Sequence, residues 1–194
     1  MVECGVKFVL RNGGVDVVRV TVSGHPGSGT STLVRSLCEV KGWSSINGGD
    51  IFREEARRRN LSLEAFSKLC IDDEKIDLDL DQELQRRMTM ENGPEVVESR
   101  LAGWWAHRLD IDCVRIWLEV NEDERAIRVV NREGGNIDTQ RAKGIERMEA
   151  DAARYLRLYG IDMDSREPYD CVIDGTNQRA DEVLAATISY LEDK

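Results

Sequence analysis

A glycine-rich stretch near the start of the chain carries residue types that bind phosphate groups. From Gly24 to Ser31 it fits the phosphate-loop pattern G-x-x-x-x-G-K-[ST], except that Thr30 stands where a lysine is usual. Glycines let bare backbone wrap around phosphate oxygens, and N–H groups at the start of a helix favour negative charge. A serine at this position supplies its hydroxyl to Mg²⁺. We predict a phosphate-binding loop; the alternative is a plain turn rich in Gly and Ser.

Arginines in the C-terminal half form a second group. Arg128 and Arg132 lie four residues apart, and a helical segment would place Arg147, Asp151 and Arg154 on one face. Guanidinium groups suit forked recognition of phosphate oxygens. The later cations follow a Gly-Gly pair, which predicts a hinged lid that closes over polyphosphate and excludes water. The alternative is a solvated helix face with salt bridges.

Arg53 and Arg100 form a third group. Arg53 lies near the start of a predicted helix, and Arg100 follows the end of a predicted strand. Paired guanidinium groups predict a clamp for the phosphate of a second substrate. The alternative is one arginine on a helix surface and another in a loop.

An alternation of strands and helices must hold these groups in place. A β-branched run at 17–22 precedes the loop, a short strand followed by a turn at the two glycines is predicted within 43–49, and further strands are predicted at 95–98, 113–120 and 169–174. This alternation predicts an α/β fold with a parallel sheet of about five strands, covered by helices on both faces. Ligands bind beyond the carboxyl ends of such strands, where Gly24 and Arg100 fall. The helical block 50–92 is too long for a simple crossover and predicts an inserted lobe.

Capping residues predict where helices begin. The predicted starts are Asp50, Ser62, Asn121 or Asp123, and Asp181. Before the first predicted strand, an Asn-Gly pair within residues 6–15 suggests either a hairpin or a loose extension.

The composition narrows the class of protein. The chain has 194 residues and a formal net charge of −10, which argues against a nucleic-acid or anionic-membrane binder. Its five cysteines are scattered without a C-x-x-C pair, so free thiols are expected rather than disulfides or a zinc site. With neither a membrane-spanning run nor a signal peptide visible, we expect a cytoplasmic monomer.

Several segments together resemble a known family. They are the loop 22–32, Gly-Asp-Ile-Phe-Arg-Glu at 49–54, Glu-Ser-Arg-Leu-Ala-Gly-Trp at 98–104, 128–134, 146–155, Tyr-Gly-Ile-Asp at 159–162 and 169–174. Over about residues 17–191 the chain resembles nucleoside-monophosphate kinases of the P-loop group, and it looks most like the archaeal-type cytidylate kinases. The Arg-Leu-Ala-Gly-Trp and Tyr-Gly-Ile-Asp segments are the most specific.

The resemblance implies a single kinase domain over 17–194 and an N-terminal extension over 1–16. Its core would be 17–49, 93–131 and 160–194, with a monophosphate-binding lobe at 50–92 and a lid at 132–159. The implied reaction is transfer of a phosphoryl group from ATP, with Mg²⁺, to CMP and dCMP.

The resemblance also implies a role for each site residue. The implied ATP-binding residues are Gly24, His25, Pro26, Gly27, Ser28, Gly29, Thr30, Ser31, Thr32 and Arg128, with Ser31 also on the metal. The implied CMP-binding residues are Arg53, Arg100 and Asp151, and the implied catalytic residues are Arg132, Arg147 and Arg154. Two positions depart from the family pattern: Thr30 replaces lysine, and Ser99 stands where glycine is usual.

Other functions stay open from the residues alone. No motif identifies the base, so a kinase for UMP or AMP is the nearest alternative. A kinase for a small non-nucleotide acid and a non-catalytic nucleotide-binding assembly factor are more distant ones. The absent lysine favours the last slightly, whereas the paired arginines argue against it.

Overall fold

The computed structural model describes residues 18–194, apart from the side chains at positions 64, 67, 71 and 72. The predicted N-terminal extension and hairpin therefore lie outside the described residues. In chain order the elements are β1 (Val20–Gly24), α1 (Thr30–Lys41), β2 (Ser45–Asn47), α2 (Gly48–Arg58), α3 (Leu63–Asp72), α4 (Glu74–Met88), β3 (Val96–Glu98), α5 (Ala102–Arg108), β4 (Val114–Glu119), α6 (Glu122–Glu133), α7 (Ile137–Tyr159), β5 (Cys171–Asp174) and α8 (Ala180–Glu192).

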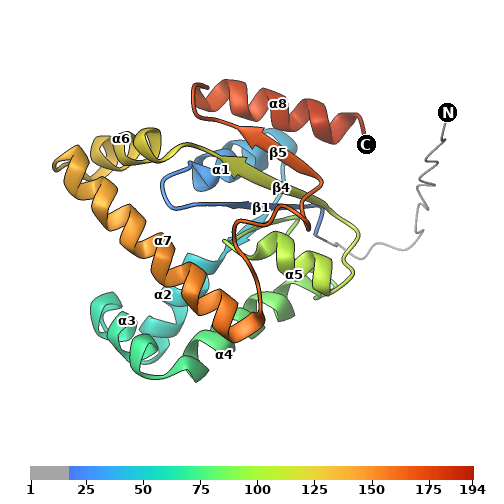
Figure 1. Ribbon diagram of the computed structural model, residues 1–194. Coiled ribbons are helices and arrows are strands. Elements are labelled where there is room, and N and C mark those ends of the chain that lie inside the picture. The colour runs from blue at the N-terminus through green and yellow to red at the C-terminus, as the bar shows by residue number, and fades with distance from the viewer. Residues whose placement is uncertain (1–17) are drawn as a thin grey trace.

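The strands form one parallel sheet in the order β2-β3-β1-β4-β5, as the alternation of elements predicts (Figure 1). Residues of β1 alternate between the two faces. Val20 and Val22 pack with Leu33 and Leu37 of α1 and with Val183 of α8. The strand register pairs Glu98, the last residue of β3, with Asn47 at the end of β2 and with Val22 of β1, so that β1 continues two residues further to Gly24 at the same edge of the sheet.

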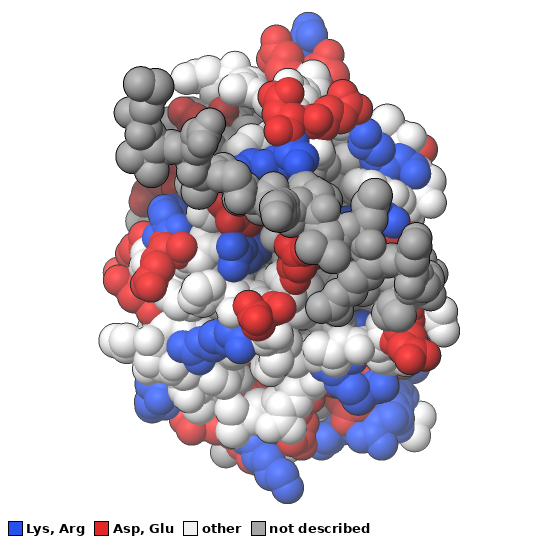
Figure 2. Space-filling model, turned by 90° about the vertical axis from the view of Figure 1, so that its right-hand side faces the viewer, with Lys and Arg blue, Asp and Glu red and all other residues white. Residues whose placement is uncertain are grey.

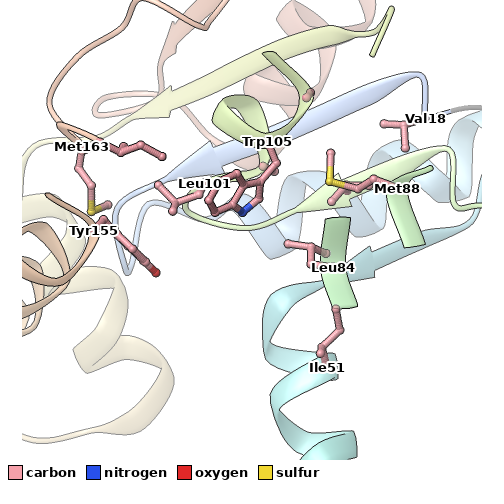
Figure 3. Close-up of a cluster of buried hydrophobic side chains, with 12 residues drawn as sticks. Val18, Ile51, Leu84, Met88, Leu101, Trp105, Tyr155 and Met163 are labelled. Carbon is pink, nitrogen blue, oxygen red and sulfur yellow. The ribbon is translucent and has the colours of Figure 1, made fainter. Parts of the chain in front are cut away.

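The opposite face of the sheet carries a second core cluster. Figure 3 shows Leu84 of α4, Trp105 of α5 and Tyr155 of α7 in this cluster, together with Leu101 between β3 and α5. It joins three regions that are far apart in the sequence, namely α4, α5 with the residue before it, and α7, and all four of these side chains are buried. The helical block therefore packs directly against the sheet that holds the phosphate loop.

The helices α2, α3 and α4 also share a small core of their own. Ala56, Phe66, Cys70 and Ile76 are buried together, and Phe52 packs against Phe66 with ring centroids 4.7 Å apart. The division of the chain into core, lobe and lid stays a prediction.

Three local predictions need correction. Asp50 does not cap α2, because Asn47 takes that place and its side chain accepts a hydrogen bond from the Asp50 N–H at 2.8 Å. The two glycines predicted as a turn are the first residues of α2, so β2 runs directly into the helix. Likewise α8 begins at Ala180 after an Arg179 N-cap, one residue before the predicted start at Asp181.

Other predicted caps are confirmed. Ser62 accepts a hydrogen bond from the Ala65 N–H at 3.1 Å, and of the two candidates for α6 Asn121 is the cap. Within residues 18–194 no helix is long and apolar enough to cross a membrane. The cysteines in that range, Cys38, Cys70, Cys113 and Cys171, are free thiols, as expected.

Candidate active site

The loop between β1 and α1 has a backbone suited to holding an anion. Gly27 and Gly29 have φ values of 87° and 95°, which side chains rarely allow. A Cβ at Gly24 would lie 2.8 Å from the Leu118 carbonyl oxygen, so this glycine is required by close packing. Gly29 caps α1 without any side-chain hydrogen bond, which leaves the first N–H groups of the helix for a ligand.

The residues that follow in the loop share one carboxylate. The hydroxyls of Thr30 and Ser31 donate to the same oxygen of Glu98, at 2.6 Å and 2.7 Å. Glu98 ends β3 and is 9 % exposed. Sequence analysis did not assign a role to this glutamate. The signal that indicates a role for Glu98 is its position at the carboxyl end of a strand that lies inside the sheet, beside the loop.

Two predicted nucleotide-binding residues, Arg128 and the loop residue Ser28, contact each other and do not line the cleft. Arg128 donates to the carbonyl oxygens of Ser28 and Gly175 at 2.8 Å and 2.6 Å, and to the Glu124 carboxylate at 2.8 Å. Ser28 is itself 1 % exposed. Here Arg128 ties the loop to the segment after β5, and neither it nor Ser28 lines the cleft described below.

A buried ion-pair network faces the loop from α7. Arg100 pairs with Asp151, and Arg154 donates to Asp77 at 2.9 Å, to Asp151 at 3.3 Å and to the Tyr155 hydroxyl at 2.8 Å. Asp151 is 7 % exposed. Helical spacing brings Asp151 and Arg154 to one face, as predicted, and the network joins that face to α4 and to the end of β3.

The other predicted arginines differ in their partners. Arg53 pairs with Asp50 at 2.6 Å, and Arg132 pairs with its neighbour Glu133, both on exposed surface. Arg147 has no ion pair with any of the residues that the structure describes. Loss of hydration and the nearby Arg100 guanidinium both lower the pKa of Arg147. Because the Arg147 guanidinium has a second positive charge nearby and no carboxylate partner among the described residues, binding an anion stabilises its charged form.

His25 directly follows Gly24 in the loop, and its ring packs edge-on against Trp117 with ring centroids 5.0 Å apart. Burial, and then the Arg125 guanidinium, lowers the pKa of His25, so its imidazole is neutral at pH 7. The side chain therefore adds shape rather than charge to the loop.

A single cleft of about 1080 Å³ unites these groups. Apart from Ser28 and Arg128, every predicted site residue lines it: Gly24, His25, Pro26, Gly27, Gly29, Thr30, Ser31, Thr32, Arg53, Arg100, Arg132, Arg147, Asp151 and Arg154. Asp77, Asp81, Glu98 and Tyr155 also line it, and sequence analysis assigned no site role to any of them. The loop and the arginines thus line one common space.

Charge is distributed differently at the other end of the molecule. Figure 2 shows the side remote from the loop, where acidic and basic side chains are interspersed over the visible described surface. The chain as a whole has a net charge of −10, and yet guanidinium groups are concentrated in the lining of the cleft.

The parallel sheet, the glycine loop and the facing arginines define a P-loop phosphotransferase. Residues 23–146 match the family described as an AAA domain. A cytidylate kinase of Methanopyrus kandleri is 36% identical over 90% of this chain and 94% of its own, and one of Pyrococcus furiosus is 38% identical over 89% of each. The chain belongs to the cytidylate kinase family.

Solved structures agree on the fold. A gluconokinase of Sinorhizobium meliloti superposes with a TM-score of 0.59, covering 91% of this chain and 92% of that one at 15% identity. At that identity the likeness concerns the arrangement of elements alone.

Proposed function

We propose that this chain transfers the γ-phosphoryl group of ATP to CMP, giving CDP and ADP, and that it also accepts dCMP. One observation carries the proposal: a phosphate loop and a cluster of arginines line one and the same cleft. A protein that only binds a nucleotide has no need of the second anion site. Membership of the cytidylate kinase family supports CMP as the acceptor.

We propose a role for each residue according to where it lies. The glycine loop and the start of α1 hold the phosphates of ATP, and Arg128 fixes the loop. Arg53 and Arg100 hold the phosphate of CMP. The CMP phosphate is already a nucleophile, so no general base is required, and catalysis consists of alignment and charge neutralisation.

Thr30 leaves the transferring group without the usual lysine. We propose that Arg132, Arg147 and Arg154 supply the missing positive charge from the lid. Arg154 is ion-paired with two carboxylates and Arg132 with one, whereas Arg147 has no ion pair with any residue from 18 to 194. The positive charge of Arg147 is therefore the least neutralised of the three. We place the lid at 132–159, the monophosphate lobe at 50–92 and the core in the remainder of 17–194.

Oxygen donors at the loop fit Mg²⁺. The Ser31 hydroxyl and the Glu98 carboxylate converge beside the loop, and hard cations prefer such oxygens. Within residues 18–194 no group of three or more His, Cys, Asp or Glu side chains could hold a metal ion. Ser31 and Glu98 would hold the ion together with the nucleotide phosphates, and the ion would neutralise phosphate charge.

Replacing Glu98 with glutamine tests this site. We expect the Mg²⁺ concentration for half-maximal ADP formation to rise about tenfold, since Glu98 also orients the Ser31 hydroxyl and partners that orient a metal ligand are commonly worth 10- to 100-fold in affinity. The measurement is a Mg²⁺ titration at fixed ATP and CMP. Glu95→Gln is the matched control, because Glu95 directly precedes β3 at the opposite end from Glu98 and does not line the cleft. An unchanged Mg²⁺ requirement in Glu98→Gln would exclude the assignment.

The function itself is tested by ADP release from ATP in the presence of CMP, dCMP, UMP or AMP. We expect the highest kcat/KM with CMP and little ADP without an acceptor. ADP release that no monophosphate stimulates would contradict the proposal. We further propose that the chain acts as a cytoplasmic monomer, because one chain supplies both walls of the cleft.

A further inference from the structure

Two aspartates on α4 line the cleft but have different partners. Asp77 and Asp81 lie one helical turn apart and both line the cleft. Asp77 is ion-paired with Arg154 at 2.9 Å. Asp81 accepts a hydrogen bond from the Tyr159 hydroxyl at 2.6 Å and has no ion pair with any residue in the described range. Asp81 is therefore a carboxylate in the site without a cation of its own.

Apolar side chains neighbour Asp81 along α4 and line the same cleft. Leu80, Leu84, Leu101 and Tyr155 line the same cleft, and the last three belong to the core cluster of Figure 3. Burial raises the pKa of Asp81 to about 6, and the negative charge of Asp77 acts in the same direction. The Tyr159 hydroxyl and the Arg154 charge offset this only in part. A flat ring that carries a hydrogen-bond donor suits this wall, because it can pack against the apolar side chains and donate to the Asp81 carboxylate oxygen that Tyr159 does not contact.

The ion pairs place this wall relative to the phosphate-binding arginines. Arg100 meets Asp151, Asp151 meets Arg154, and Arg154 meets Asp77, one turn before Asp81 on the same face of α4. The guanidinium groups and Asp81 thus follow one another along the cleft. A nucleotide whose phosphate lies at Arg100 and whose ribose crosses Arg154 brings its base to Asp81.

We propose that Asp81 selects the base of the acceptor by accepting a hydrogen bond from the exocyclic amine of a 4-aminopyrimidine. Tyr159 occupies one carboxylate oxygen, Oδ2, and leaves Oδ1 for the ligand. Uracil has a carbonyl oxygen in place of the amine, so two acceptors would face each other at an apolar wall. This inference rests on the proposed function and adds the residue that distinguishes CMP from UMP.

The test is the ratio of kcat/KM for CMP to kcat/KM for UMP. In Asp81→Asn we expect this ratio to fall about 100-fold, because a site that pairs with a substrate N–H discriminates by at least that factor. The asparagine amide can donate to the uracil carbonyl, so kcat/KM for UMP should hold or rise. A smaller fall is expected for Asp81→Ala, which removes the acceptor without adding a donor.

Asp79→Asn is the matched control, since Asp79 is an exposed aspartate on the same helix and does not line the cleft. Its ratio should equal that of the wild type. A ratio in Asp81→Asn within twofold of the wild-type value would overturn the inference, including when overall activity falls, because a purely structural role lowers both substrates alike. If the wild-type chain forms no ADP with CMP, the proposed function fails first, and this result is distinct from an unchanged ratio.

Discussion

Arg147→Ala is expected to lower kcat about 1000-fold, since an arginine that neutralises a transferring phosphoryl group is commonly worth 10³ to 10⁵ in rate. Arg147 lines the cleft beside Arg100 and has no ion pair with any residue from 18 to 194. Its removal therefore leaves no carboxylate unpaired. The KM values for ATP and CMP should change much less than kcat, because the interaction strengthens as charge develops on the moving group.

Lys143→Ala serves as the control for this prediction. Lys143 is an exposed cation on α7, one turn before Arg147, and does not line the cleft. It should keep wild-type kcat, and both variants should unfold at the wild-type temperature. Turnover by Arg147→Ala within a few-fold of wild type would remove Arg147 from the proposed mechanism and leave Arg132 and Arg154 as the source of charge.

Arg100→Ala is expected to reduce kcat/KM for CMP at least about 100-fold, the usual effect of losing one charged donor at a reacting centre. Unlike Arg147, this arginine also supports the structure. Its loss leaves the nearly buried Asp151 carboxylate with Arg154 as its remaining partner at 3.3 Å. We expect the free energy of unfolding to fall by about 2 kcal/mol, within the range for an under-satisfied buried polar group.

A double variant separates the two effects of Arg100. In Arg100→Ala with Asp151→Asn, the unpaired charge is removed, so part of the stability should return in chemical denaturation. The activity toward CMP should stay low because the phosphate still lacks its partner. Recovery of both stability and activity would show that Arg100 acts only through Asp151 and does not hold the acceptor.

Local sequence patterns predicted the framework of this site because they depend on short-range physics. Glycine spacing located the loop from Gly24 to Gly29, and helical periodicity placed Arg147 and Arg154 on one face that lines the cleft. The order of strands and helices predicted the parallel sheet. The local pattern does not decide which residue caps a helix. Asn47 and Asp50 both have side chains that can cap α2, and only the backbone path of β2 decides between them.

The pairings across the cleft could not be predicted in the same way. Arg154 meets Asp77 across 77 residues of chain, and Tyr159 meets Asp81 across 78. No periodicity links positions so distant, and each aspartate has the same sequence appearance as an exposed one. The same holds for Arg128: the family resemblance implies a contact with ATP, which stays a prediction, and no sequence pattern indicates that its guanidinium donates to two carbonyl oxygens and a carboxylate.

The carboxylate of Glu98 has a consequence for which form of ATP the chain accepts. It sits against the two hydroxyls at the mouth of the loop, where the triphosphate must arrive. Uncomplexed ATP brings about four further negative charges toward it, whereas a triphosphate that already carries a divalent cation brings about half of that charge and presents a cation to the carboxylate. We therefore expect the loop to act as an electrostatic filter that favours the metal complex over the bare nucleotide, so that a cell depleted of free divalent cations would slow this step even with ample ATP.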